Sequence, residues 1–386
     1  MSFDSPPLPS MFDRLCLEIP EAVNEAVQAA HTPLSTAGAS WRAQLNQISL
    51  ETFLPWLQEE HAAKVWPSVA ALPSFWELVN GAAIECDDVR LVLIPTVDID
   101  LRELRVPQEW VDIPSWSADY YVAVQTNPNA GWLKIWGYAT HHQLKTKGTY
   151  NDNDRTYALD EDNLIQDFNV LWVARQLCPE EPLRTEVSPV PALQRSQAEN
   201  LLERLGNPTV VFPRLAVPFP LWAGLLEHGG WRQRLYEKRQ GFANLWSVPQ
   251  WLQAGISGLA EQLGWQGRSI PFAVQRMRSR SEPTQRLSRP LEIAGHQYEL
   301  QIFPSGDREE HIWRFELRPT DADRQIPAGF KLRLLTEDLQ PFEHNEDTAI
   351  EAVARLYVDV ILEPGEGLVW EVEPMPEGYD REILNF

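Results

Sequence analysis

The sequence is poor in cysteine and in basic residues, and both shortages exclude classes of protein. Its 386 residues include three cysteines, Cys16, Cys86 and Cys178, which are far apart and odd in number. This usage argues against a disulfide framework or a zinc site and suits a reducing compartment, so we expect a cytoplasmic protein. Lysine and arginine total 33 against 55 aspartates and glutamates, a net charge of −22. Such a molecule repels phosphate backbones and anionic lipid, so we do not expect nucleic acid as a partner.

Long uninterrupted apolar runs are missing too. The most apolar window, residues 209–226, contains Arg214 and three prolines, which deny it a continuous helix. We therefore expect no membrane span and interpret this window as a buried, proline-punctuated connector. The N-terminal stretch lacks the basic and apolar regions of a signal peptide, so we expect no export.

The motifs of the common enzyme classes are absent as well. No phosphate-binding glycine consensus occurs, and the nearest match to a nucleophile elbow, Ser257, lies in a helical stretch. His141 and His142 are adjacent rather than spaced as metal ligands. In the acidic stretch 151–162, a calcium-loop register starting at Asp152 puts Tyr157 where Gly is required and Asn163 where Glu is required. Cys86, in an apolar run, is typical of a buried small hydrophobe. We predict no catalytic residue, cofactor or metal, and we favour a protein that is not an enzyme.

What is present is a composition that can build a core: 44% of the residues are apolar and 23% are charged. Because single cores rarely exceed about 250–300 residues, more than one folding unit is expected. We predict an α+β protein, mostly antiparallel. Its expected segments are a helix-flanked β domain (1–180), a linker with a small helical module (181–267), an Arg-rich linker (268–290) and a C-terminal β-sandwich (291–386).

Apolar spacing in the first domain predicts helices at 21–30, 40–60 and 163–178, with Pro55 bending or dividing the second. Between them, short β-rich runs predict antiparallel strands of a β-barrel-like or sandwich domain. These runs are FWELV, AAIEC, VRLVLIP, YYVAVQT and GWLKIWGYAT. The last two runs, joined by Asn-Pro-Asn-Ala, are the clearest hairpin.

Two features stand above this background. The first is tryptophan: of 16 in the chain, Trp110 and Trp116 are predicted to lie in a loop between strands, near Tyr120. They are either a partner-binding surface or a plug for the end of a small barrel.

The second feature is six arginines within 22 residues, against one acid, Glu282. The segment could dock an acidic partner, the protein's own acidic domains or a nucleic acid, or serve as a passive linker. Cleavage within 277–289 would make it a proteolytic switch. The arginines are Arg268, Arg276, Arg278, Arg280, Arg286 and Arg289.

The C-terminal run IPAGFKLRLLTEDLQPFEHNEDTA, followed by LYVDVILEPGEGLVWEVEP and DREILNF, resembles the end of the cyanobacterial family catalogued as domain of unknown function 1822. Asn244, Trp251, Leu252, Trp265 and Gln266 are similar to a second motif of that family. The resemblance implies a cyanobacterial, intracellular protein, and it suggests a sigma factor or a caspase-like protease as a partner. It implies no chemistry.

We therefore hypothesise a non-enzymatic regulatory or adaptor protein that binds another protein. The residues predicted to bind the partner are Trp110, Trp116, Tyr120, Arg276, Arg278, Arg280 and Arg286. The alternative is a ligand-binding or enzymatic β-barrel in the N-terminal domain. Its pocket would be lined by Trp110, Trp116, Tyr120 and Trp136.

Overall fold

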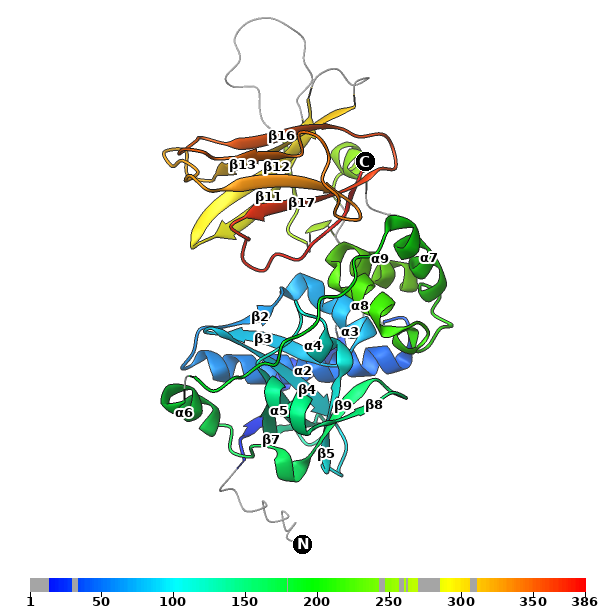
Figure 1. The fold of residues 1–386 in the computed structure, drawn as a ribbon, viewed down its shortest axis with the longest axis vertical. Coiled ribbons are helices and arrows are strands. Elements are labelled where there is room, and N and C mark those ends of the chain that lie inside the picture. The colour runs from blue at the N-terminus through cyan, green and yellow to red at the C-terminus, as the bar shows by residue number, and fades with distance from the viewer. Residues whose placement is uncertain are drawn as a thin grey trace, which may run out of the picture. The chain divides into compact units, whose positions relative to one another are not determined.

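The computed structural model describes residues 14–29, 34–178, 180–242, 247–256, 260–261, 263–269, 285–305 and 311–386 (Figure 1). The chain divides into two compact units, and their sequences interleave. The first unit contains the chain up to Pro191 and then Pro208–Glu227, and the second contains Ala192–Asn207 and His228–Phe386. The helices expected as one module at 181–267 are therefore shared between the two units. Helices and mainly antiparallel sheets occur in both halves, as expected for an α+β protein.

The first unit is a six-stranded sheet covered by helices, with a smaller three-stranded sheet beside it. Its elements are β1 (Cys16–Glu18), α1 (Glu21–Ala29), α2 (Ala37–Gln58), β2 (Ala63–Trp66), α3 (Leu72–Leu78), β3 (Ala82–Cys86), β4 (Val89–Thr96), β5 (Glu103–Pro107), α4 (Gln108–Asp112), β6 (Tyr120–Asn127), β7 (Trp132–Thr140), α5 (His141–Lys147), β8 (Thr149–Asn151), β9 (Thr156–Asp160), α6 (Val170–Leu177) and α8 (Phe219–Glu227).

The large sheet has the order β1-β7-β6-β4-β3-β2. The predicted β6–β7 hairpin is confirmed and closes with Asn127 opposite Trp132. The expectation that all these strands are antiparallel is wrong for one pair, because β4 and β6 run parallel. A parallel pair needs a crossover, and the chain between β4 and β6 supplies it through β5 and α4. Helix α2 packs across β2, β3, β4 and β6.

Three local predictions for this unit need correction. The run FWELV forms most of helix α3, which begins at Leu72 with a proline in its first turn, a position where proline's missing N–H costs nothing. Of the bend or division expected at Pro55, the division is wrong, because α2 continues to Gln58. The helix predicted at 163–178 begins only at Val170. Short apolar runs do not separate strand from helix, and this explains the first error.

The second unit contains helices and two antiparallel sheets. Its elements are α7 (Arg195–Leu205), α9 (Gly229–Arg239), α10 (Val248–Ala254), β10 (Gln266–Ser269), β11 (Gln285–Ile293), β12 (His296–Pro304), β13 (Ile312–Pro319), β14 (Lys331–Thr336), β15 (Glu346–Thr348), β16 (Leu356–Ile361), β17 (Gly367–Glu373) and β18 (Leu384–Asn385). The sheet orders are β10-β11-β12-β13-β16 and β15-β14-β17-β18. Strands of both sheets and helix α10 contribute to one shared core, which has Trp370 and Leu300 among its fully buried side chains.

The predicted Arg-rich linker is partly strand. Arg286 and Arg289 lie in β11, which pairs with β10 from Gln285 to Ser288 and with β12 from Leu287 to Ile293. The Arg289 guanidinium lies within 2.5 Å of a Glu382 carboxylate oxygen, so it is tied to its own unit rather than exposed on a tether. Arg276, Arg278, Arg280 and most of the proposed cleavage window lie outside the described residues.

Candidate functional site

The aromatic residues predicted to bind a partner lie in the core of the first unit. Trp110 and Trp116 are each 1% exposed and Tyr120 is 3% exposed. The Trp110 and Trp116 rings lie 5.1 Å apart, and the Trp110 Nε1 donates a hydrogen bond to the Asn80 carbonyl. Trp136 is equally buried. This burial favours the alternative expected from the sequence, in which the rings pack inside the unit.

Of the arginines predicted to bind a partner, Arg286 lies within the described residues. Its guanidinium lies over the Phe303 ring at 4.1 Å and donates to Gln301 Oε1. Both contacts are with residues of the second unit, so the Arg286 side chain packs against its own unit. Arg276, Arg278 and Arg280 lie outside the part of the chain that the structure describes.

A surface that the sequence analysis missed lies on α6. Val170, Val173 and Leu177 recur at helical spacing on one side of this helix, and their side chains are 41%, 52% and 75% exposed. We name these three residues the α6 stripe. The opposite side packs inward through buried Leu171 and through Trp172, whose ring meets Phe168 edge-on. The apolar period of α6 was visible in the sequence, but the period alone does not tell which apolar side chains the fold leaves uncovered.

Carboxylates flank the α6 stripe in the chain. Asp162 and Asp167 precede the helix, Glu180 and Glu181 follow it, and all four are exposed. The stripe thus lies between acidic segments of a chain whose net charge is −22.

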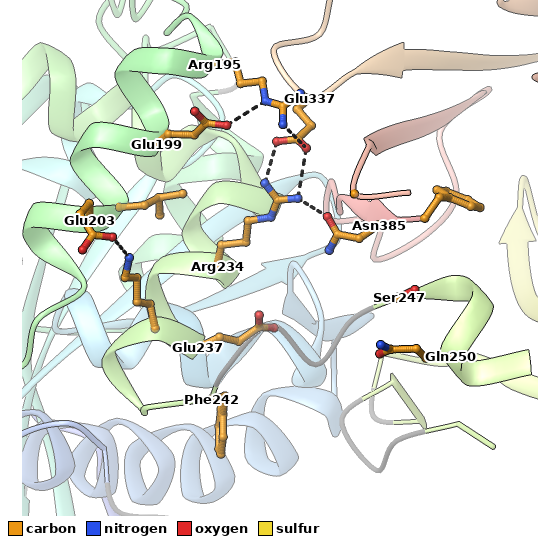
Figure 2. Close-up of a pocket in the computed structure, with 14 residues that line it drawn as sticks. Arg195, Glu199, Glu203, Arg234, Glu237, Phe242, Ser247, Gln250, Glu337 and Asn385 are labelled. Atoms are coloured by element: carbon orange, nitrogen blue, oxygen red, sulfur yellow. Dashed lines mark hydrogen bonds and ion pairs between the residues drawn. The ribbon is translucent and has the colours of Figure 1, made fainter. Parts of the chain in front are cut away.

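A second candidate site is a polar pocket of about 690 Å³ in the second unit (Figure 2). Its walls come from α7, α9, the start of α10, the turn after β14 and the C-terminal strand. The lining residues are Arg195, Glu199, Leu202, Glu203, Arg234, Glu237, Lys238, Phe242, Ser247, Gln250, Glu337, Gly365, Asn385 and Phe386. A volume of this size is typical of small-molecule sites.

Each cation of the pocket is paired with a carboxylate. Arg195 Nε donates to Glu199 Oε1 at 2.9 Å, and Lys238 pairs with Glu203. Figure 2 shows the Glu337 carboxylate between the guanidinium groups of Arg195 and Arg234, and the Arg234 Nη1 lies 2.6 Å from Glu337 Oε2. Glu337 itself is buried.

Glu237 carries a strongly perturbed carboxyl in this pocket. Burial raises the pKa of Glu237 to about 7, while a hydrogen bond from Gln233 Nε2 and the charge of Arg234 oppose that rise. A carboxyl that titrates near neutral pH can accept or donate a proton, or bind a cation in exchange for one. Sequence reasoning could not find it, because the shift comes from burial rather than from a motif.

The architecture is thus that of an α+β protein with an exposed apolar helix face and a polar pocket. The chain matches the family model described as protein of unknown function (DUF1822) over residues 17–385, so it belongs to this family. The resemblance noted from the C-terminal motifs is confirmed at the level of the family. No curated protein and no solved structure shows a significant match to the chain. Among the described helices, none combines the length and the apolar character needed to cross a bilayer.

Proposed function

We propose that the protein is a non-enzymatic cytoplasmic adaptor that binds another protein through the α6 stripe. The observation that carries the proposal is the exposure of Val170, Val173 and Leu177 on one helix face. Single exposed apolar side chains are ordinary on protein surfaces, whereas several gathered on one face are typical of interaction sites. A helix that presents i, i+3 and i+7 apolar residues suits a partner with an apolar groove.

Charge narrows the class of partner. Because acidic residues flank the stripe and the chain carries a net charge of −22, a partner groove with a basic rim would be attracted and a second copy of the chain repelled. A sigma factor or a caspase-like protease in a cyanobacterial host, the partners that the family resemblance suggests, are the first to test for such a groove. The free thiols of Cys16 and Cys178, both exposed, suit a reducing compartment.

The test is a quantitative pull-down from the native host with a paired control. The double variant Val173→Ser, Leu177→Ser should lose the partner, because burial of two aliphatic side chains contributes about 1.5–3 kcal/mol each. The matched control Ile99→Ser removes an apolar side chain that is 94% exposed in a loop of the same unit, and it should retain the partner. Equal retention by both variants, or equal loss, would refute the α6 stripe as the binding surface.

A second candidate function, ligand binding, is supported by Glu237 in the second unit's pocket. Among the described residues that line the pocket, four glutamates outnumber three cations, and Phe242 and Phe386 add apolar surface. This combination favours a small organic cation. Thermal-shift titration with diamines and polyamines at pH 8 should stabilise the wild type and not Glu237→Gln. A shift of equal size in both proteins would exclude this use of the pocket.

A further inference from the structure

Three potential metal ligands of different chemistry meet in the first unit. His61 lies between α2 and β2, Cys86 ends β3, and Asp87 begins the turn into β4. One potential ligand atom from each side chain lies within 4.8 Å of the others. The His61 Nδ1 and the Asp87 Oδ2 are 3.1 Å apart. The number and spacing of the cysteines argued against a zinc site, but this cluster joins residues from different elements.

We propose that His61, Cys86 and Asp87 bind a zinc ion, with a fourth position left to water. Imidazole, thiolate and carboxylate together match the borderline-soft character of zinc and are a poor set for magnesium or calcium. Ligand atoms at roughly 2.0–2.3 Å from one ion lie less than about 4.6 Å apart, so movements of about an ångström close the cluster. Asp87 and His61 are partly exposed, which leaves the ion a route from solvent.

The charges around the cluster favour a cation. The carboxylates of Asp87 and Asp88 directly follow Cys86 in the chain, and their negative charge attracts a divalent ion. Arg175 is the opposing charge, and it is engaged with Asp88. Binding forms the Zn–S bond, and the Cys86 proton leaves to solvent.

A bound ion would also affect the contact between His61 and helix α6. The His61 ring stacks on Trp172 of α6 at 3.9 Å between ring centroids. A bound ion would therefore join the chain after α2 to the β3–β4 turn and fix the ring on which α6 packs. The metal proposal does not depend on the adaptor role, because metal binding is measured without any partner.

The test is titration of the tag-free, chelator-treated full chain with Co²⁺ and then Zn²⁺. One Co²⁺ per chain should give the near-ultraviolet charge-transfer band of a cobalt–thiolate bond, and Zn²⁺ should displace it. Cys86→Ala should abolish the band. His61→Ala and Asp87→Asn should weaken binding by at least the roughly 10–100-fold that loss of an outer-shell partner costs.

Controls separate this site from adventitious binding. Cys16→Ser and Cys178→Ser alter the exposed cysteines and should keep the band unchanged. A band that survives in Cys86→Ala, or disappears in Cys178→Ser, overturns the assignment, as does the absence of any band in the wild type. Because Cys86 is buried, far-ultraviolet circular dichroism must show that Cys86→Ala is folded. The half-exposed Asp87 supplies a variant that leaves the core intact.

Discussion

At the scale of single residues, we expect the stability of the first unit to depend on the buried carboxylate of Glu109. Glu109 is fully buried, and Arg214 holds both of its oxygens, with the Nη2 to Oε2 distance 2.6 Å. The Trp222 Nε1 donates to the same carboxylate at 2.7 Å. Arg214→Met should leave this charge unpaired and lower the free energy of unfolding by about 3–5 kcal/mol, measured by urea denaturation.

The control for this prediction is an exposed ion pair. Glu199→Gln removes the i, i+4 partner of Arg195, and it should cost less than about 1 kcal/mol. If Arg214→Met were no more destabilising than Glu199→Gln, the buried network would not be a determinant of stability.

Glu237 gives a second prediction at this scale, through pH. Its pKa rises from 4.5 in the unfolded chain to about 7 in the fold, so folding disfavours the ionised form. The stability that this group contributes is therefore complete below pH 4.5 and is lost as the pH rises to about 7. Glu237→Gln should match the wild type at pH 4 and exceed its unfolding free energy by about 3 kcal/mol at pH 8. A difference that does not change with pH would show that Glu237 is not desolvated.

At the scale of elements, residues 183–191 form an irregular segment of the first unit, which we name the strap. Two sets of hydrogen bonds hold it, one made by Arg184 and one by Thr185. The Arg184 guanidinium forms a bidentate ion pair with the Asp119 carboxylate, with Nε to Oδ1 at 2.6 Å and Nη2 to Oδ2 at 2.8 Å. The Thr185 amide donates to Nδ1 of buried His141, whose Nε2 lies 3.0 Å from the Val111 carbonyl. His141 must therefore be neutral to accept from Thr185.

Acid should break the hydrogen bond between the Thr185 amide and His141 Nδ1. Burial lowers the pKa of His141, and the cations of Lys145 and Arg184 add to this effect, while the Val111 carbonyl and Asp112 oppose it. The stability contributed by neutral His141 is present above pH 6.5 and is lost as the pH falls towards the lowered pKa. Hydrogen exchange at the Thr185 amide, corrected for intrinsic rates, should then accelerate by about fivefold, the effect of a hydrogen bond of about 1 kcal/mol.

The matched variant for the strap is His141→Asn. Its amide oxygen can replace Nδ1 as the acceptor but does not titrate over this range, so protection at Thr185 should be flat with pH. An identical pH response in the variant would assign the loosening to another group.

The elements that could be predicted from the sequence are those whose pattern lies within a few neighbouring residues. The β6–β7 hairpin was predictable because alternation and turn residues are local. The run FWELV, most of which lies in helix α3, was mistaken for a strand because so short an apolar run is compatible with either period. Trp110 was placed in a loop although it lies in helix α4 and is buried. The pairs Glu109–Arg214 and His61–Cys86 join residues that no local pattern connects, so only the fold brings them together.

At the scale of the whole molecule, the two units exchange segments along the chain. The first unit takes Pro208–Glu227 from beyond a stretch that belongs to the second, Ala192–Asn207. Composition predicted boundaries at 180 and 267 because proline-rich and arginine-rich stretches are typical linkers. Linker composition cannot reveal that a later segment returns to complete an earlier core.

This interleaving predicts how the protein can be divided. A fragment of residues 1–227 retains Trp222, which is fully buried, and Arg214, so it should unfold cooperatively as a monomer. A fragment of residues 1–191 loses both partners of Glu109 and should be less stable by at least about 3–5 kcal/mol, with weakened near-ultraviolet circular dichroism. Fragment 1–227 carrying Arg214→Met and Trp222→Ala should behave like the shorter one, because the same contacts are missing. Equal stability of fragments 1–191 and 1–227 would mean that the returning segment is an accessory, and the boundary near 180 would then be the correct one.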